Sequence, residues 1–270
     1  MSLVDTNWLE ENLNKVKIID SSWHMPNVNR NANEEYIQEH ITGAIFFDID
    51  KYSNLKTDLP HMLPDKDDWE KTVSSLGISN KDKIIIYDNS DVLSSCRCWY
   101  NFIYFGHDPN LIKVLDGGFK KWKLEKKIIT NQSTKIFKSE YKSQENQELV
   151  KNKTQIDDNI KKKEFLVIDA RGKDRFDGKV PEPRKNVRSG SIPNSICLPF
   201  KELINENNTF KNVSEISKKF DEIIKINNEN RVFSCGSGIT ACVLALAYSM
   251  VNNKYSPTIY DGSWSEYGRI

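Results

Sequence analysis

Short runs of apolar residues recur along this chain, and each run stops at a polar residue or a cysteine. The clearest are Val16–Asp20, Lys83–Asp88, Phe165–Asp169 and Arg231–Cys235. Runs of this length are typical of strands that are buried on both faces of a parallel sheet. The longer apolar stretches Cys96–Phe105 and Thr240–Val251 predict helices packed between them. Strands that alternate with helices indicate an α/β fold built on parallel sheets.

The same series of segments occurs twice, once in each half of the chain. The corresponding pairs are Val16–Asp20 with Phe165–Asp169, His40–Ile45 with Ser191–Ile196, Lys83–Asp88 with Arg231–Cys235, and Val114–Gly118 with Ile259–Ser263. An internal repeat of this size indicates two tandem domains of one fold, each a parallel sheet flanked by helices. We predict an N-terminal domain over residues 1–130 and a C-terminal domain over residues 153–270.

The segment between the two halves, residues 131–152, is rich in polar and charged residues. This composition favours a linker that wraps between the domains. The alternative is an extra surface strand and helix, since Ile136, Phe137 and Tyr141 could each bury a side chain.

Charge and composition narrow the classes of partner. The 270 residues include 39 Lys and Arg against 38 Asp and Glu, so neither nucleic acid nor an anionic membrane is indicated as a partner. No apolar run approaches the roughly 20 residues that span a bilayer, and the first residues do not resemble a secretory signal. We therefore expect a cytoplasmic protein.

Five cysteines in such a chain are expected to be free thiols. Cys96 and Cys98 are two residues apart, which fits neither a redox pair nor a zinc knuckle, and no histidine pair lies nearby. We predict no metal site and no cofactor.

One cysteine, Cys235, lies where a buried strand turns into a helix. Gly236 and Gly238 flank this turn and allow its amides to point inward toward the sulfur. Amides that converge at the start of a helix stabilise an anion, and a thiolate is such an anion. Cys235 is therefore a candidate nucleophile, with a small buried core residue as the alternative.

The equivalent position in the first half is occupied by Asp88. An aspartate cannot act as a thiolate nucleophile, so we predict that the second half carries the chemistry. The arginine that a phosphatase loop needs six residues after its cysteine is replaced by Ala241, which argues against phosphoryl chemistry. A cysteine protease would need a histidine beside Cys235, and the surrounding residues do not resemble the signatures of that class.

These features together resemble the two-domain rhodanese (sulfurtransferase) family, of the 3-mercaptopyruvate sulfurtransferase type. The loop Cys235–Ala241 resembles the active loop of that type. Further segments resemble family signatures in the family's order: Ala44–Asp50, His61–Pro64, Asp116–Gly118, Pro181–Arg184 and Tyr260–Trp264. The resemblance spans nearly the whole chain.

The resemblance implies a role for each residue of the loop. Cys235 would form a persulfide, and Ser237 would lie beside the sulfur as a hydroxyl donor. Gly236, Gly238, Ile239 and Thr240 would belong to the amide cradle that binds substrate.

Two arginines are implied to bind the carboxylate of the substrate, Arg175 and Arg184. The planar guanidinium suits this because it engages a carboxylate through two parallel hydrogen bonds. The alternative for either is a surface or interdomain ion pair. Arg171 and Arg188 are expected to be structural.

His40 matches a histidine that reaches toward the cleft in family members, where it could assist proton movement. The family pairs that histidine with an aspartate, whereas this chain has Asn31 at the corresponding position. A turn-stabilising role for His40 is the alternative. His24, His61 and His107 are expected to be structural.

The implied reaction is a ping-pong transfer in which Cys235 takes sulfur from 3-mercaptopyruvate and releases pyruvate. A thiol, either a small molecule or a thioredoxin-like protein, or cyanide then accepts the sulfur. Gly236, Ser237 and Gly238 carry no charge, which favours a carboxylate donor over the dianion thiosulfate. Thiosulfate:cyanide transfer and a non-catalytic sulfur-carrier or regulatory module are the alternatives.

Overall fold

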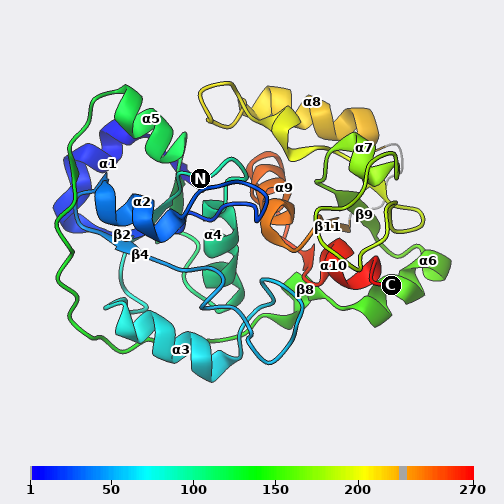
Figure 1. The fold of residues 1–270 in the computed structure, drawn as a ribbon, viewed down its shortest axis with the longest axis horizontal. Helices are drawn as coiled ribbons and strands as arrows, with labels where there is room; N and C mark the ends of the chain where they lie inside the picture. The colour runs from blue at the N-terminus through cyan, green and yellow to red at the C-terminus, as the bar shows by residue number, and fades with distance from the viewer. Residues whose placement is uncertain (1, 225–229) are drawn as a thin grey trace. The chain divides into compact units, whose positions relative to one another are not determined.

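The computed structural model describes residues 2–224 and 230–270, which form two compact units (Figure 1). Of these residues, the first unit comprises 2–55, 63–146 and 206–209, and the second comprises 56–62, 147–205, 210–224 and 230–270. Each unit therefore takes one short segment from the other half of the chain. Residues 131–146 belong to the first unit.

The first unit is built on a five-stranded sheet whose strand order is β1-β6-β5-β2-β4. All neighbouring strands in it are parallel. The strands are β1 (Leu3–Val4), β2 (Lys17–Asp20), β4 (Ala44–Phe46), β5 (Ile84–Tyr87) and β6 (Ile112–Leu115), and a separate antiparallel pair is formed by β3 (His40–Ile41) and β7 (Ile129–Thr130). The helices are α1 (Thr6–Asn12), η1 (Leu13–Lys15), α2 (Ala32–Gln38), α3 (Lys66–Ser75), α4 (Ser95–Tyr104) and α5 (Gly118–Leu124).

The second unit repeats this architecture with the strand order β10-β9-β11-β12-β8, again parallel throughout. The strands are β8 (Val150–Lys151), β9 (Leu166–Asp169), β10 (Ile196–Cys197), β11 (Arg231–Ser234) and β12 (Ile259–Tyr260). The helices are η2 (Gln147–Leu149), α6 (Lys153–Lys162), α7 (Lys173–Phe176), η3 (Phe200–Leu203), α8 (Val213–Ile223), α9 (Ile239–Val251) and α10 (Ser263–Tyr267).

The predicted fold class is confirmed, because each half forms a parallel sheet flanked by helices. Strand β5 corresponds to β11 in the two sheets, and α4 corresponds to α9. The central strands are apolar along their length because helices cover both faces, and β5 is buried at all four positions.

Residues 131–152 are neither a linker throughout nor an extra strand followed by a helix, the two forms that the sequence suggested. Residues 131–146 contain no helix or strand, whereas Val150 and Lys151 form strand β8 at the edge of the second sheet. Tyr141 is buried and stacks with His107. Phe137 is 69% exposed.

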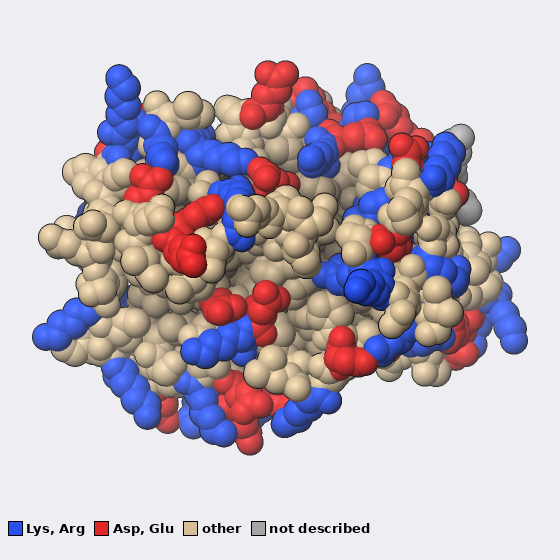
Figure 2. All heavy atoms as spheres, in the orientation of Figure 1, with Lys and Arg blue, Asp and Glu red and all other residues tan. Residues whose placement is uncertain are grey.

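Figure 2 shows Lys and Arg side chains interspersed with those of Asp and Glu on the face drawn. None of the helices formed by residues 2–224 and 230–270 combines the length and apolar character needed to cross a bilayer.

Asp88 follows β5 at the point where Cys235 follows β11. Its carboxylate is buried and accepts hydrogen bonds from the backbone N–H groups of Ser90 and Ser95, each at 2.9 Å. Burial raises the pKa of Asp88, and it raises the pKa of the neighbouring Asp20 to about 6. The first unit therefore carries a pair of buried carboxyl groups at the carboxyl ends of two adjacent strands.

This burial predicts a pH effect on stability. The folded-state pKa of Asp20 lies above its ordinary value of 3.8, so the protonated carboxyl stabilises the fold at low pH, and this stability is lost as pH rises through about 6. Asp20→Asn should therefore raise the free energy of unfolding, by about 2 kcal/mol more at pH 7.5 than at pH 4.5. Urea unfolding at both pH values measures this, with the exposed Asp67→Asn as control. An equal gain at both values would contradict the assignment.

Candidate active site

Cys235 lies immediately after β11 and is only 2% exposed. Its backbone N–H donates to Ser263 Oγ at 3.1 Å, and its carbonyl accepts from the N–H of Trp264 at 2.9 Å. The carbonyl of Gly236 accepts in the same way from Ser265 at 2.8 Å. The start of α10 therefore fixes the backbone of the cysteine loop on one side.

The loop ends at Gly238, which caps the start of α9 with a φ of +79°. A residue with a side chain rarely adopts this left-handed backbone, so glycine is needed here. Ile239 and Thr240 form the first positions of the helix. The positive end of the α9 dipole consequently lies at the loop, where it favours an anion such as a thiolate or persulfide.

Arg175 and Arg184 meet at Gly236. A Cβ atom at Gly236 would lie 3.2 Å from Arg175 Nη2 and 3.7 Å from Arg184 Nη1. Both guanidinium groups therefore lie beside the residue that follows Cys235. The structure thus brings together Cys235 and the two arginines that the sequence proposed for carboxylate binding.

Glu182 holds Arg175 in place, and sequence reasoning did not single out this residue. Its Oε1 accepts from Arg175 Nε at 3.2 Å and from Arg171 Nη1 at 2.8 Å. The Glu182 side chain is only 3% exposed, whereas that of Arg175 is 24% exposed. Arg175 is therefore oriented by a buried carboxylate while its head remains partly accessible.

Arg171 and Arg188 have structural surroundings, as expected. Arg171 is buried and pairs with Asp169 at 2.7 Å as well as with Glu182. The guanidinium groups of Arg171 and Arg188 lie over the ring of Trp264, 4.6 Å and 4.7 Å from its centroid.

Ser237 is hydrogen-bonded to two cationic or titratable side chains. Its Oγ lies 2.9 Å from His61 Nδ1 and accepts from Arg184 Nη2 at 3.1 Å. His61 is 4% exposed and belongs to the segment 56–62, which packs with the second unit. His61 was expected to be structural, so this contact identifies a candidate functional residue that sequence reasoning missed. The signal available was the signature segment that His61 begins.

His40 belongs to the first unit and is 1% exposed. Its Nδ1 lies 2.6 Å from the carbonyl of Tyr36 and its Nε2 lies 3.2 Å from the carbonyl of Gln132. The ring also stacks on Tyr36 at 4.1 Å. Asn31 caps α2 by accepting from the N–H groups of Asn33 and Glu34. These contacts favour the turn-stabilising alternative for His40.

The other cysteines have the surroundings of packed thiols. Cys242 is buried in α9, where its thiol donates to the carbonyl of Gly238 at 3.1 Å. Burial raises the pKa of Cys197 to about 12 and raises that of Cys98 further. None of the five cysteines, all of which lie within the described residues, forms a disulfide. Within the described residues, no three His, Cys, Asp or Glu side chains are grouped so as to hold a metal ion.

Comparison with known proteins identifies the family of both halves of the chain. Residues 5–125 and 152–269 both match the rhodanese-like domain. The chain is 37% identical over 288 residues to thiosulfate/3-mercaptopyruvate sulfurtransferase 1, mitochondrial, of Arabidopsis thaliana, covering 98% of this chain and 75% of the relative. It is 35% identical over 274 residues to the 3-mercaptopyruvate sulfurtransferase of Mus musculus, covering 98% and 91%.

A solved structure shares the whole architecture. The crystal structure of SseA from Escherichia coli, described among 3-mercaptopyruvate sulfotransferases, superimposes with a TM-score of 0.87 at 29% identity and covers 98% of this chain and 99% of that one. Both halves match one domain model, and the match to these relatives is nearly full length. The chain therefore belongs to the rhodanese family of sulfurtransferases, with two rhodanese-like domains in tandem.

Proposed function

We propose that this protein transfers sulfur from 3-mercaptopyruvate, through a persulfide on Cys235, to a thiol or cyanide and releases pyruvate. The observation that carries the proposal is the meeting of Arg175 and Arg184 at Gly236, next to the cysteine. A carboxylate bound by these two guanidinium groups would hold a three-carbon donor beside the Cys235 sulfur.

The first half-reaction is a displacement at the donor sulfur. The Cys235 thiolate attacks this sulfur, a new S–S bond forms, and the C–S bond of the donor breaks. The electron pair of that bond stays on carbon and gives the enolate of pyruvate, which takes up a proton. The loop and the start of α9 stabilise the anionic sulfur throughout.

Ser237 is the proposed source of the proton for the enolate. Its hydroxyl lies between His61 Nδ1 and Arg184 Nη2, and no other hydroxyl belongs to the loop from Cys235 to Ile239. We assign His61 the role of a positioning residue that holds this hydroxyl and exchanges a proton with it.

In the second half-reaction an acceptor attacks the outer sulfur of the persulfide. The S–S bond breaks, the acceptor leaves with the sulfur, and Cys235 returns as a thiolate. A small thiol, a thioredoxin-like protein or cyanide fits this step, which needs no metal or cofactor. A cytoplasmic location stays a prediction, and the Arabidopsis relative is named as mitochondrial.

Thiosulfate is the second candidate donor, because the name of the Arabidopsis relative includes both substrates. A compact dianion would gain from a cation within the loop, but Gly236, Ser237 and Gly238 carry none. The guanidinium groups of Arg175 and Arg184, which lie beside Gly236, instead offer planar pairs of N–H donors to the two oxygens of a carboxylate. We therefore place 3-mercaptopyruvate first.

Replacement of the nucleophile should abolish the reaction. Cys235→Ser should lower pyruvate release from 3-mercaptopyruvate by about 10³-fold or more, because no thiolate remains to attack. Mass spectrometry after brief exposure to the donor should find one added sulfur atom on Cys235 of the wild type. Cys242→Ser is the matched control and should keep both signals. Pyruvate release that persists in Cys235→Ser would contradict the proposal.

Loss of a carboxylate ligand should weaken binding of the donor. Arg184→Gln should raise the KM for 3-mercaptopyruvate by about 10- to 100-fold, the range expected when one charge-assisted hydrogen bond is lost. Steady-state kinetics with both donors measure this, with the exposed Arg269→Gln as control. A higher kcat/KM for thiosulfate than for 3-mercaptopyruvate in the wild type would overturn the donor assignment.

The proton role of Ser237 distinguishes the two donors. Ser237→Ala should lower kcat for 3-mercaptopyruvate by about 10²-fold, because an enolate must be protonated at carbon. Thiosulfate leaves sulfite, which needs no such proton, so its kcat should change much less. His61→Gln should shift the pH profile of the first reaction alone. Equal losses with both donors would instead indicate a merely structural role for the pair.

A further inference from the structure

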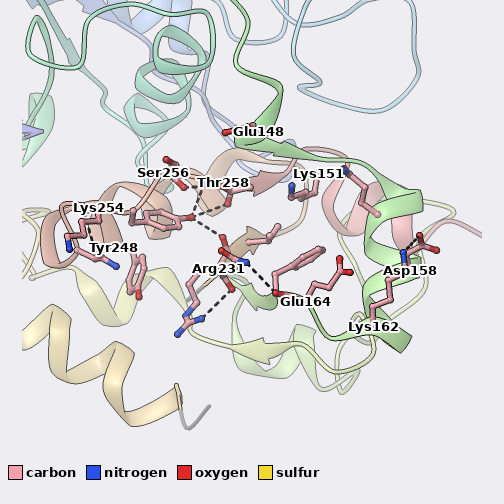
Figure 3. A pocket seen from close by; sticks show the side chains of 16 residues that line it. Glu148, Lys151, Asp158, Lys162, Glu164, Arg231, Tyr248, Lys254, Ser256 and Thr258 are labelled. Atoms are coloured by element: carbon pink, nitrogen blue, oxygen red, sulfur yellow. Dashed lines mark hydrogen bonds and ion pairs between the residues drawn. The ribbon is translucent and has the colours of Figure 1, made fainter. Parts of the chain in front are cut away.

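A second site of polar character lies at the opposite end of the strand that carries Cys235. A cavity of about 930 Å³ opens at the amino ends of β9, β11 and β12 (Figure 3). Arg231 is the first of the four residues of β11 and Cys235 follows the last, so about 13 Å of extended chain separates them. Volumes of this size accommodate a small organic ligand.

Arg231 lines this cavity, and its guanidinium group forms few hydrogen bonds with the described residues. The residue is 6% exposed, and its Nε is buried without a hydrogen-bond partner. The hydrogen bond it does form runs from Nη1 to the carbonyl of Asn230, at 3.3 Å. Within residues 2–224 and 230–270, no carboxylate forms an ion pair with Arg231. A buried charge without a counterion is costly, and folded proteins normally pair it.

The carboxylates that line the cavity are directed elsewhere. Asp158 pairs with Lys162 at 3.2 Å on α6. In Figure 3 this pair lies on the right, and Glu148 and Glu164 also lie apart from the Arg231 guanidinium. The Arg231 guanidinium therefore lies apart from the carboxylates that line the same cavity.

Further polar groups lie on the side of Arg231. Figure 3 shows Tyr248 and Lys254 at the same end of the cavity as the guanidinium. The ring of Tyr248 is held by edge contacts with Phe220 and Tyr255, each at 4.8 Å between centroids. A firmly packed phenol and an exposed lysine thus accompany the arginine.

We propose that this cavity is a second binding site, distinct from Cys235, for a small ligand with an oxyanion group, either phosphate or carboxylate. The Arg231 guanidinium binds the oxyanion through its planar fork, and Lys254 adds a second positive charge. The ligand supplies the counter-charge that the described protein groups do not. This site goes beyond the sulfur transfer proposed above and does not depend on it.

Thermal unfolding of the full-length protein tests the site, with phosphate and acetate as probes against chloride at equal ionic strength. A ligand that binds the folded state raises the melting temperature, by about 2–4 °C for a probe at ten times its dissociation constant. We expect this rise with phosphate or acetate in the wild type. It should persist in Arg184→Gln, in which binding at the Cys235 site is weakened.

Arg231→Met should abolish the rise and, in chloride, should melt no lower than the wild type, because it removes a buried charge for which the described residues provide no counterion. Lys254→Gln, a surface change that leaves the core intact, should reduce the rise and provides the test should Arg231→Met fail to fold. Arg269→Gln is the control and should behave as the wild type. The proposal is overturned if neither probe raises the melting temperature, or if the rise survives both cavity variants. It is also overturned if Arg184→Gln alone removes the rise.

Discussion

The buried ion-pair network around Arg171 is the interaction on which the active site depends. The charged Arg171 side chain is buried and forms ion pairs with Asp169, at the end of β9, and with Glu182. Removing one member of such a network typically costs about 3–5 kcal/mol, because it leaves an uncompensated buried charge. The network therefore fixes the chain between β9 and Glu182, and with it the position of Arg175.

This arrangement explains how a flexible arginine becomes an ordered ligand. Glu182 Oε1 accepts from both Arg171, which is fully buried, and Arg175, which is partly exposed, while its Oε2 accepts from Arg175 alone. Arg175 thus loses little further side-chain entropy when a carboxylate binds. Gly236 completes the site because any Cβ there would lie 3.2 Å from Arg175.

The two units show how one strand–turn–helix frame serves two chemistries. In the first unit the turn holds Asp88, whose carboxylate accepts two backbone N–H groups. In the second unit the turn holds Cys235, whose backbone N–H donates a hydrogen bond to Ser263 Oγ. Asp88 and Cys235 thus occupy equivalent turns that lead into a helix. Of the two side chains, only the cysteine thiol is a strong nucleophile toward sulfur.

Local patterns in the sequence determined the central strands of both sheets, the helices α4 and α9, the internal repeat and the cysteine turn. This was possible because each depends on side-chain periodicity or on glycines within a few residues. The pairing of His61 with Ser237 depends on a contact across 176 positions, which periodicity does not encode. The same limit applies to Glu182, to the carbonyl partners of His40 and to the Arg231 guanidinium, for which the described residues provide no carboxylate. Tertiary packing decides which residue pairs with a buried charge. The reason is that the free-energy cost of an unpaired charge depends on its burial, and the spacing of residues along the sequence does not determine burial.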